Sequence, residues 1–323
     1  MRTYPLAAIA VLALSLPGLA LAQAKAFPDH PLRFVVPFTA GGNADVVARI
    51  VAQGMTEVLK QSVVVDNKPG ANAMIGSEAV ARAPADGYTL LEATAETHAI
   101  NPHIYKKVPY DAIRDFAAVG VMDYFPFALV VNPKLPVQTG KEFVAYAKEH
   151  AGKLSFASWG VGSTSQIAFE QFKQTAGLDL LHVPFQGAAP AVTAVSAGQV
   201  DAFFVPLSVA VPQAKSGRVK LLGTTTAARV ASAPEVPTLS EQGYPIVIGG
   251  WHVIVAPKAV PKDVVARLNQ ALNDALARKE VREALLKQGL EPANTSAAEA
   301  DRMLQAEWQR WGKIAKDAAI TVD

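Results

Sequence analysis

Residues 31–49 have the sequence PLRFVVPFTAGGNADVVAR, and this stretch decides the fold of the chain around it. A short apolar strand at residues 34–36 is followed by Gly41 and Gly42, and then by apolar residues at helical spacing through Leu59. A strand, a glycine turn and a helix start bring several backbone amides to one point, with the positive end of the helix dipole behind them. Such a point binds anions. The pattern equally fits an ordinary turn between a strand and a helix, whose glycines serve only the turn.

Length, charge and the N-terminus limit the class of protein. The chain has 323 residues, is 50% hydrophobic and has a net charge of +2. It is long enough for two domains, and its charge gives no electrostatic basis for a nucleic-acid or anionic-membrane partner.

Residues 1–22 have Arg2, an interrupted apolar run and Ala20-Leu21-Ala22, which predicts a secretory signal cleaved after about Ala22. A retained anchor is disfavoured, because the unbroken run is shorter than about 20 residues.

The absence of cysteine also bears on localisation. Without cysteine there is no lipid attachment site near the cleavage point and no disulfide framework. We therefore expect a soluble exported protein, located in the periplasm of a bacterium with two membranes.

Strands and helices alternate along the first part of the chain. Strands are expected at 62–66 and 88–91 and a helix at 75–83, which gives a β-α-β-α-β order and a parallel sheet. Residues 94–98 are expected to form a loop at the end of a strand, and residues 101–115 to be irregular. An extended run at 119–131 contains Pro126, which predicts a strand that bends or changes sheet.

The second part repeats the same order. A strand at 154–158 leads into a second glycine loop at 159–165 and a helix. The apolar run after Trp251 is expected to return to the first domain, which helical regions at 261–287 and 297–319 complete. Each domain thus begins its ligand side with a strand, a glycine loop and a helix start, which favours a two-lobed binding protein. The predicted boundaries are 1–22 for the signal peptide, 23–125 with 252–323 for lobe 1, and 126–251 for lobe 2.

Six segments, in chain order, carry a resemblance to a known family. They are PFTAGGNADVVARIVA, VVVDNKPGANAMIGSEAVARAPADGYTLL, INPHIYKKVPYDAIRDFAAVG, GKLSFASWGVGSTSQ, HVPFQGAAPAVTAVSAGQVDAFF and RLNQAL. Together they resemble the solute-binding receptors of tripartite tricarboxylate transporters, the Bug family, over essentially the whole mature chain. The resemblance implies an α/β, two-lobed periplasmic binding protein of type II (Venus flytrap), with a mostly parallel doubly wound sheet in each lobe and two hinge crossings. It also implies small carboxylate ligands and membrane permease subunits as partners.

The resemblance further implies that backbone amides of both glycine loops hold a carboxylate. It maps the first loop onto residues 38–45 and the second onto residues 158–166. Gln166-Ile167 stands where the family commonly has His before Leu, and Asn43-Ala44 where a Ser-Thr-like pair is usual, so both departures bear on ligand choice.

The predicted ligand-binding residues come from the two loops and from the carboxyl ends of other strands. They are Phe38, Thr39, Gly41, Gly42, Asn43, Ala44, Asp45, Thr94, Thr97, His98, Ser158, Trp159, Gly162, Ser163, Thr164, Gln166, Phe185, Gln186, Gly187 and Pro206.

Some of these residues have a second interpretation. Asp45 is placed mainly as a helix-capping residue paired with Arg49 four positions on, and secondarily as a contact to a ligand hydroxyl or water. Ser163 and Gln166 fit an S-x-x-Q capping box, which for Gln166 is as good an interpretation as ligand contact. Ser163 and Thr164 are better ligand candidates, because their hydroxyls and amides lie at the loop. The aromatic residues Phe38, Trp159 and Phe185 fit the walls of a site and a core equally.

The sequence disfavours an enzyme. GVGSTS lacks the third glycine of a dinucleotide loop, and His98 and His103 do not form a metalloprotease motif. No G-x-S-x-G, Walker loop or cysteine nucleophile is present. We therefore expect a monomeric receptor, without cofactor or metal, that captures a dicarboxylate or an aromatic acid and delivers it to a permease. The alternatives are a periplasmic sensor presenting the same complex to a signalling partner, and an enzyme on a two-lobed scaffold.

Overall fold

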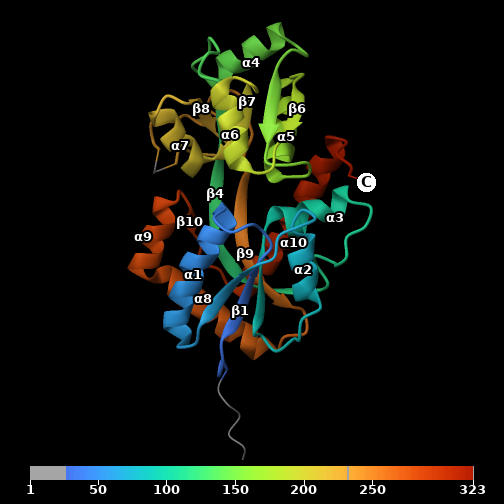
Figure 1. Ribbon diagram of the computed structural model, residues 1–323, viewed down its shortest axis with the longest axis vertical. Helices are drawn as coiled ribbons and strands as arrows, with labels where there is room; N and C mark the ends of the chain where they lie inside the picture. Colours follow the sequence, from blue (N-terminus) through green and yellow to red (C-terminus); the bar gives the residue numbers. More distant parts are fainter. Residues whose placement is uncertain (1–26, 231–232, 323) are drawn as a thin grey trace, which may run out of the picture.

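The computed structural model describes residues 27–230 and 233–322, so the predicted signal peptide lies outside the described residues. The protein has two α/β lobes joined by two long strands (Figure 1). The strands follow the order β2-β1-β3-β9-β4-β7-β5-β6, and β8 and β10 pair with β4 beside this path. The predicted two-lobed α/β fold with two crossings is confirmed. No helix in the described ranges has the length and apolar character needed to cross a bilayer.

Lobe 1 is built on three parallel strands. β1 (Leu32–Val36) lies between β2 (Val63–Asn67) and β3 (Thr89–Ala93). The burial pattern explains the assignment, because Phe34, Val35 and Val36 are all fully buried. Figure 1 shows one group of helices on one side of this sheet and a second group on the other. The first group is α1 (Asn43–Leu59), α8 (Lys262–Ala277) and α9 (Lys279–Lys287), and the second is α2 (Met74–Ala81), α3 (Asn101–Ile104) and α10 (Ala297–Asp317).

Lobe 2 repeats this arrangement. β5 (Ser155–Ser158) lies between β6 (Leu181–Pro184) and β7 (Ala202–Pro206), again in parallel. Its helices are α4 (Gly140–Glu149), α5 (Thr164–Ala176), α6 (Ala188–Ala197) and α7 (Leu207–Lys215). Each lobe therefore has a parallel core of three strands, and the remaining strands pair antiparallel, which makes the sheet as a whole mixed.

The two crossing strands are β4 (Phe116–Val131) and β9 (Gly249–Pro257). From Phe116 to Pro126, β4 pairs antiparallel with β9, and from Phe127 onward it pairs with β7 and β8 (Lys220–Thr224). The strand thus changes partners at Pro126, as the sequence predicts. Gly250 on the opposing strand has no side chain, and a Cβ there would collide with the ring of Phe125. The short β10 (Glu291–Pro292) pairs with β4 on the lobe 1 side.

Three expectations about local structure are wrong, the first being irregular backbone from residue 101, where α3 forms instead. Residues 94–98 do not form a loop, because a π-helix, η1 (Glu96–Ile100), follows β3 and leads directly into α3. Residues 91–100 are all buried, and a helix satisfies backbone groups that a loop would leave unpaired in the interior. The helical region at 261–287 is also divided, because the extended backbone of Arg278 (ψ 134°) separates α8 from α9.

Candidate ligand-binding site

The first glycine loop, residues 38–45, ends at the N-terminus of α1. Gly41 has φ 82°, a conformation that favours glycine, and Gly42 is the N-cap residue with an extended backbone. No side chain caps this helix. Thr39, Gly41 and Gly42 are exposed, so the amide groups of the first turn, which have no acceptor within the helix, lie beside an open surface.

Asp45 holds this loop in place. Its carboxylate accepts hydrogen bonds from the Gly41 amide (2.9 Å), from Arg49 Nε (3.0 Å) and from Asn67 Nδ2 (2.9 Å). The predicted pair with Arg49 is confirmed, whereas the predicted capping role is wrong, because no side chain caps α1 and Asp45 accepts instead from the residue before the N-cap. Burial opposes ionisation of Asp45, but the hydrogen bonds from Arg49, Gly41 and Asn67 outweigh it, so the pKa of Asp45 lies below its ordinary value. Asn67 also donates to the Phe38 carbonyl (3.1 Å), which ties the loop to β2.

The second glycine loop, residues 158–166, ends at the N-terminus of α5. Ser163 is the N-cap, and its Oγ accepts from the Gln166 amide (3.4 Å). Gln166 Oε1 accepts from the amide of Gly162 (2.7 Å) instead of the amide of Ser163, so the predicted capping box is present only in part. The Gly162 amide of this loop therefore has a partner within the protein, as the Gly41 and Gly42 amides of the more exposed first loop also do.

The remaining predicted residues of lobe 2 surround this loop. Ser158 is buried, with its Oγ 2.7 Å from His182 Nε2, and Trp159 packs edge-on against Phe127 with ring centroids 5.7 Å apart. Phe185 is half-buried, and its amide donates to the Ser158 carbonyl (3.0 Å). Gln186 is exposed, Gly187 is the N-cap of α6 with φ 115°, and Pro206 is buried where β7 ends.

Glu96 connects the two lobes at the second loop. Its Oε1 accepts from the Thr164 amide (3.0 Å), from Thr164 Oγ1 (2.8 Å) and from Trp159 Nε1 (3.3 Å). Its Oε2 accepts from Thr94 Oγ1 (3.0 Å) within lobe 1. The sequence-based set includes Thr94 and Thr97 but omits Glu96. The sequence signal for Glu96 was an acidic side chain between Thr94 and Thr97, directly after the carboxyl end of β3.

Thr97 and His98 lie away from the loops. Thr97 Oγ1 accepts from the Thr94 amide (2.9 Å). Thr97 and His98 are completely buried in lobe 1. The His98 ring lies against Phe116 at 4.8 Å between centroids, and its Nε2 has no hydrogen-bond partner among the described residues. Burial lowers the pKa of His98 to about 3, so the ring is neutral.

A buried polar cluster lies on the two crossing strands and the neighbouring strand β3. His252 Nδ1 on β9 lies 3.0 Å from the carboxylate of Asp123 on β4, and Phe125 stacks on the His252 ring at 5.0 Å. Burial disfavours the charged imidazole, but Asp123, Glu92 and Glu96 outweigh it and raise the pKa of His252 to about 9. Glu92 on β3 is fully buried, and burial raises its pKa to about 8.

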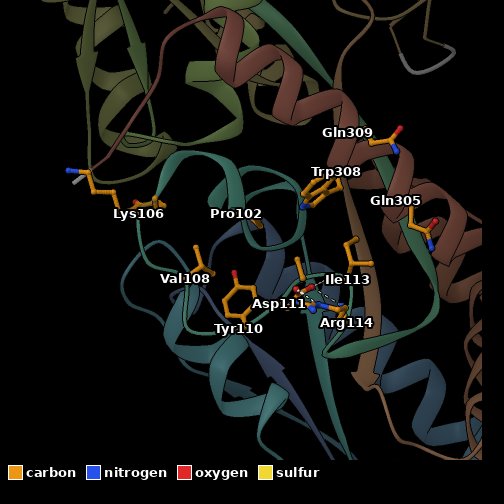
Figure 2. A pocket seen from close by; sticks show the side chains of 12 residues that line it. Pro102, Lys106, Val108, Tyr110, Asp111, Ile113, Arg114, Gln305, Trp308 and Gln309 are labelled. Carbon is orange, nitrogen blue, oxygen red and sulfur yellow. Dashed lines mark hydrogen bonds and ion pairs between the residues drawn. The ribbon is translucent and has the colours of Figure 1, made fainter.

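Both loops lie at the waist between the lobes, where the N-terminal ends of α1 and α5 are found in Figure 1. The second loop contacts lobe 1 closely, since a Cβ at Gly162 would collide with Ile104. Two hollows are found elsewhere. One of about 670 Å³ lies beside Trp308, Tyr110 and Arg114 (Figure 2), and another of about 320 Å³ lies at the crossing strands. No predicted ligand-binding residue lines either of these two.

Comparison with known proteins identifies the family. Residues 47–320 match the model of the tripartite tricarboxylate transporter family receptor. The chain belongs to this receptor family. Its sequence is 37% identical over 293 residues to a UPF0065 protein from the tcbD–tcbE intergenic region of Pseudomonas sp. strain P51, covering 90% of this chain and 86% of that protein. This family consists of substrate-binding receptors rather than enzymes.

Solved structures of similar proteins include ligand complexes. The Rhodopseudomonas palustris protein Rpa4515 with adipate is 33% identical with a TM-score of 0.85, covering 91% of this chain and 99% of that one. MatC from the same organism, with bound malate, is 31% identical with a TM-score of 0.80, covering 89% and 99%. The periplasmic binding protein BugD is 34% identical with a TM-score of 0.81, covering 91% and 99%. This receptor is thus of the Bug type, whose members are periplasmic binding proteins.

Proposed function

We propose that this receptor captures a small carboxylate between the loops at 38–45 and 158–166 and delivers it to the membrane permease of a tripartite tricarboxylate transporter. The observation that carries the proposal is the N-terminus of α1, which is uncapped by any side chain and bordered by exposed residues of a glycine loop. The adipate and malate bound by two relatives support the class of ligand.

The physical basis is a set of fixed donors. Each hydrogen bond from a backbone amide to a carboxylate contributes roughly 1.5 to 3 kcal/mol, and a helix N-terminus adds about 0.3 to 1 kcal/mol. Asp45 and Asn67 fix the first loop through hydrogen bonds, so its amides lose little entropy on binding. The crossing strands β4 and β9 serve as the hinge, and closure around the ligand gives the shape that a permease recognises.

The proposal includes the cellular context. The receptor is exported to the periplasm with its signal cleaved after about Ala22, and it acts as a monomer without cofactor. Residues 23–125 with 252–323 form lobe 1, and residues 126–251 form lobe 2. The ligand class covers dicarboxylates and aromatic acids, and loss of uptake on deletion of the gene would separate transport from sensing.

Substitution of Gly42 tests the first loop. Gly42 has φ −78°, which any residue adopts, and a Cβ would lie 3.5 Å from the Thr39 carbonyl, an ordinary contact. Gly42→Val is therefore expected to fold normally while its side chain stands over the amides of the first turn. The affinity for the carboxylate should fall at least tenfold, and Gly42→Ala should give a smaller loss.

Calorimetry measures this effect once a thermal-shift screen of adipate, malate and aromatic acids has given a ligand. Ala151→Val, at an exposed turn of lobe 2, is the surface control and should bind like the wild type. Unchanged affinity of Gly42→Val would contradict the role of the first loop. A wild type that binds no acid of the screen would overturn the carboxylate receptor itself.

A further inference from the structure

The second glycine loop already holds a carboxylate that belongs to the protein. Glu96 comes from lobe 1, while the three donors on its Oε1 come from Thr164 and Trp159 of lobe 2. Thr164 is the first residue of α5, so the carboxylate lies where a helix N-terminus favours negative charge. The proposed function would have placed a carboxylate of the ligand at this position.

Glu96 is buried, and both of its carboxyl oxygens accept hydrogen bonds. The side chain is 7% exposed, and its two oxygens together accept four hydrogen bonds, including one from Thr94. Thr164 is also buried, and Trp159 is held edge-on by Phe127 and Phe203. The Thr164 donors of the second loop are thus used within a buried contact. In the first loop the Gly41 amide donates to Asp45 and the Gly42 amide to the Thr39 carbonyl, but residues 39–42 remain exposed.

The carboxylate of Glu96 disfavours a second anion at the second loop. Its Oε1 already accepts from the Thr164 amide, Thr164 Oγ1 and Trp159 Nε1. A second carboxylate of a ligand, brought to the second loop, would meet the Glu96 carboxylate at the same donors. The two carboxylates would lie close together, and like charges at close range repel strongly where water is excluded.

We propose that Glu96 is a specificity-determining residue, which occupies the anion position of the second loop and so restricts the receptor to ligands with a single carboxylate, held by the first loop. This inference rests on the proposed function and narrows it, because a dicarboxylate would have to displace Glu96 from Thr164 and Trp159. A neutral or hydrogen-bonding distal end of the ligand meets no such repulsion.

The test uses pairs of acids that differ by one carboxylate: hexanoate and adipate, butyrate and succinate, benzoate and terephthalate. Calorimetry gives the affinity of the mature protein for each acid. We expect the wild type to bind at least one monocarboxylate at least tenfold more tightly than its dicarboxylate counterpart. Glu96→Ala frees the Thr164 amide and hydroxyl, and the dicarboxylate of that pair should then bind at least tenfold more tightly, while the monocarboxylate changes less than threefold.

Two further variants separate charge from folding. Glu96→Gln keeps the size of the side chain and an acceptor for Thr164 but removes the negative charge, so its preference should lie between those of the wild type and Glu96→Ala. Glu283→Ala removes an exposed carboxylate on α9 and should leave all affinities unchanged. Circular dichroism and thermal melting of each variant establish that it is folded.

The outcomes distinguish this inference from the function on which it rests. A wild type that binds a dicarboxylate as tightly as its partner acid, or a preference that Glu96→Ala leaves unaltered, overturns the role of Glu96 while the carboxylate receptor stands. If neither the wild type nor Glu96→Ala binds any acid of the three pairs, the carboxylate receptor is overturned as well.

Discussion

Glu92 should make the stability of this receptor depend on pH in a way that a single substitution removes. The side chain is fully buried on β3, and neither carboxyl oxygen has a hydrogen-bond partner in the described part of the chain. Burial raises its pKa from 4.5 to about 8, an effect that the charge of His252 opposes and that of Asp123 increases. The folded protein therefore keeps Glu92 protonated at neutral pH, whereas the unfolded chain ionises it.

The sign and size of the effect follow from linkage. Between pH 4.5 and pH 8 the folded state binds one more proton at Glu92 than the unfolded state. The stability contributed by this group is complete below 4.5 and is lost as the pH rises through the folded pKa. At about 1.4 kcal/mol per pH unit, the free energy of unfolding should fall by about 3 kcal/mol between pH 5 and pH 8. Glu92→Gln has the same size and does not titrate, so it lacks this loss.

Urea denaturation of both proteins at pH 5 and pH 8 measures the difference. The free energy of unfolding of Glu92→Gln relative to the wild type should rise by about 3 kcal/mol from pH 5 to pH 8. His252, whose pKa is raised to about 9, is present in both proteins, so its contribution largely cancels in the comparison. Glu283→Gln, an exposed carboxylate, is the control and should follow the wild type. If the difference in unfolding free energy between the wild type and Glu92→Gln is the same at the two pH values, the inference that Glu92 is buried and protonated is refuted.

Two other substitutions test contacts at the crossing and at the second loop. Asp123→Asn leaves His252 buried without its counter-charge and should cost about 3 to 5 kcal/mol in urea denaturation; a loss below about 1 kcal/mol would contradict the ion pair. Gly162→Ala places a side chain at φ 75° and against Ile104, and should cost at least about 1 kcal/mol of unfolding free energy. Ile104→Val in the same chain should recover part of that loss, and no recovery would argue against the contact.

The sequence by itself determined the features that depend on neighbours along the chain. The strand, glycine turn and helix start of each lobe were predictable, because the apolar periodicity and the turn residues that define them lie within one segment of about twenty residues. The pair of Asp45 and Arg49 follows from their spacing of four on α1, and the change of partners in β4 follows from a proline that cannot donate to a ladder. The family was recognisable for the same reason, since its motifs are continuous segments.

Only the tertiary structure decided which distant groups meet and which lose contact with water. Glu96 lies 68 residues before Thr164, and no local pattern indicates that its carboxylate occupies the N-terminus of α5. Glu92, Asp123 and His252 come from three strands whose neighbours are set by the crossings, and their protonation follows from the burial of that junction. Residues 94–98 become helical for a related reason, because the interior leaves their backbone groups no other partner. Burial and charge–charge interactions depend on positions in space, so the contacts and protonation of these groups are determined only when the lobes are assembled.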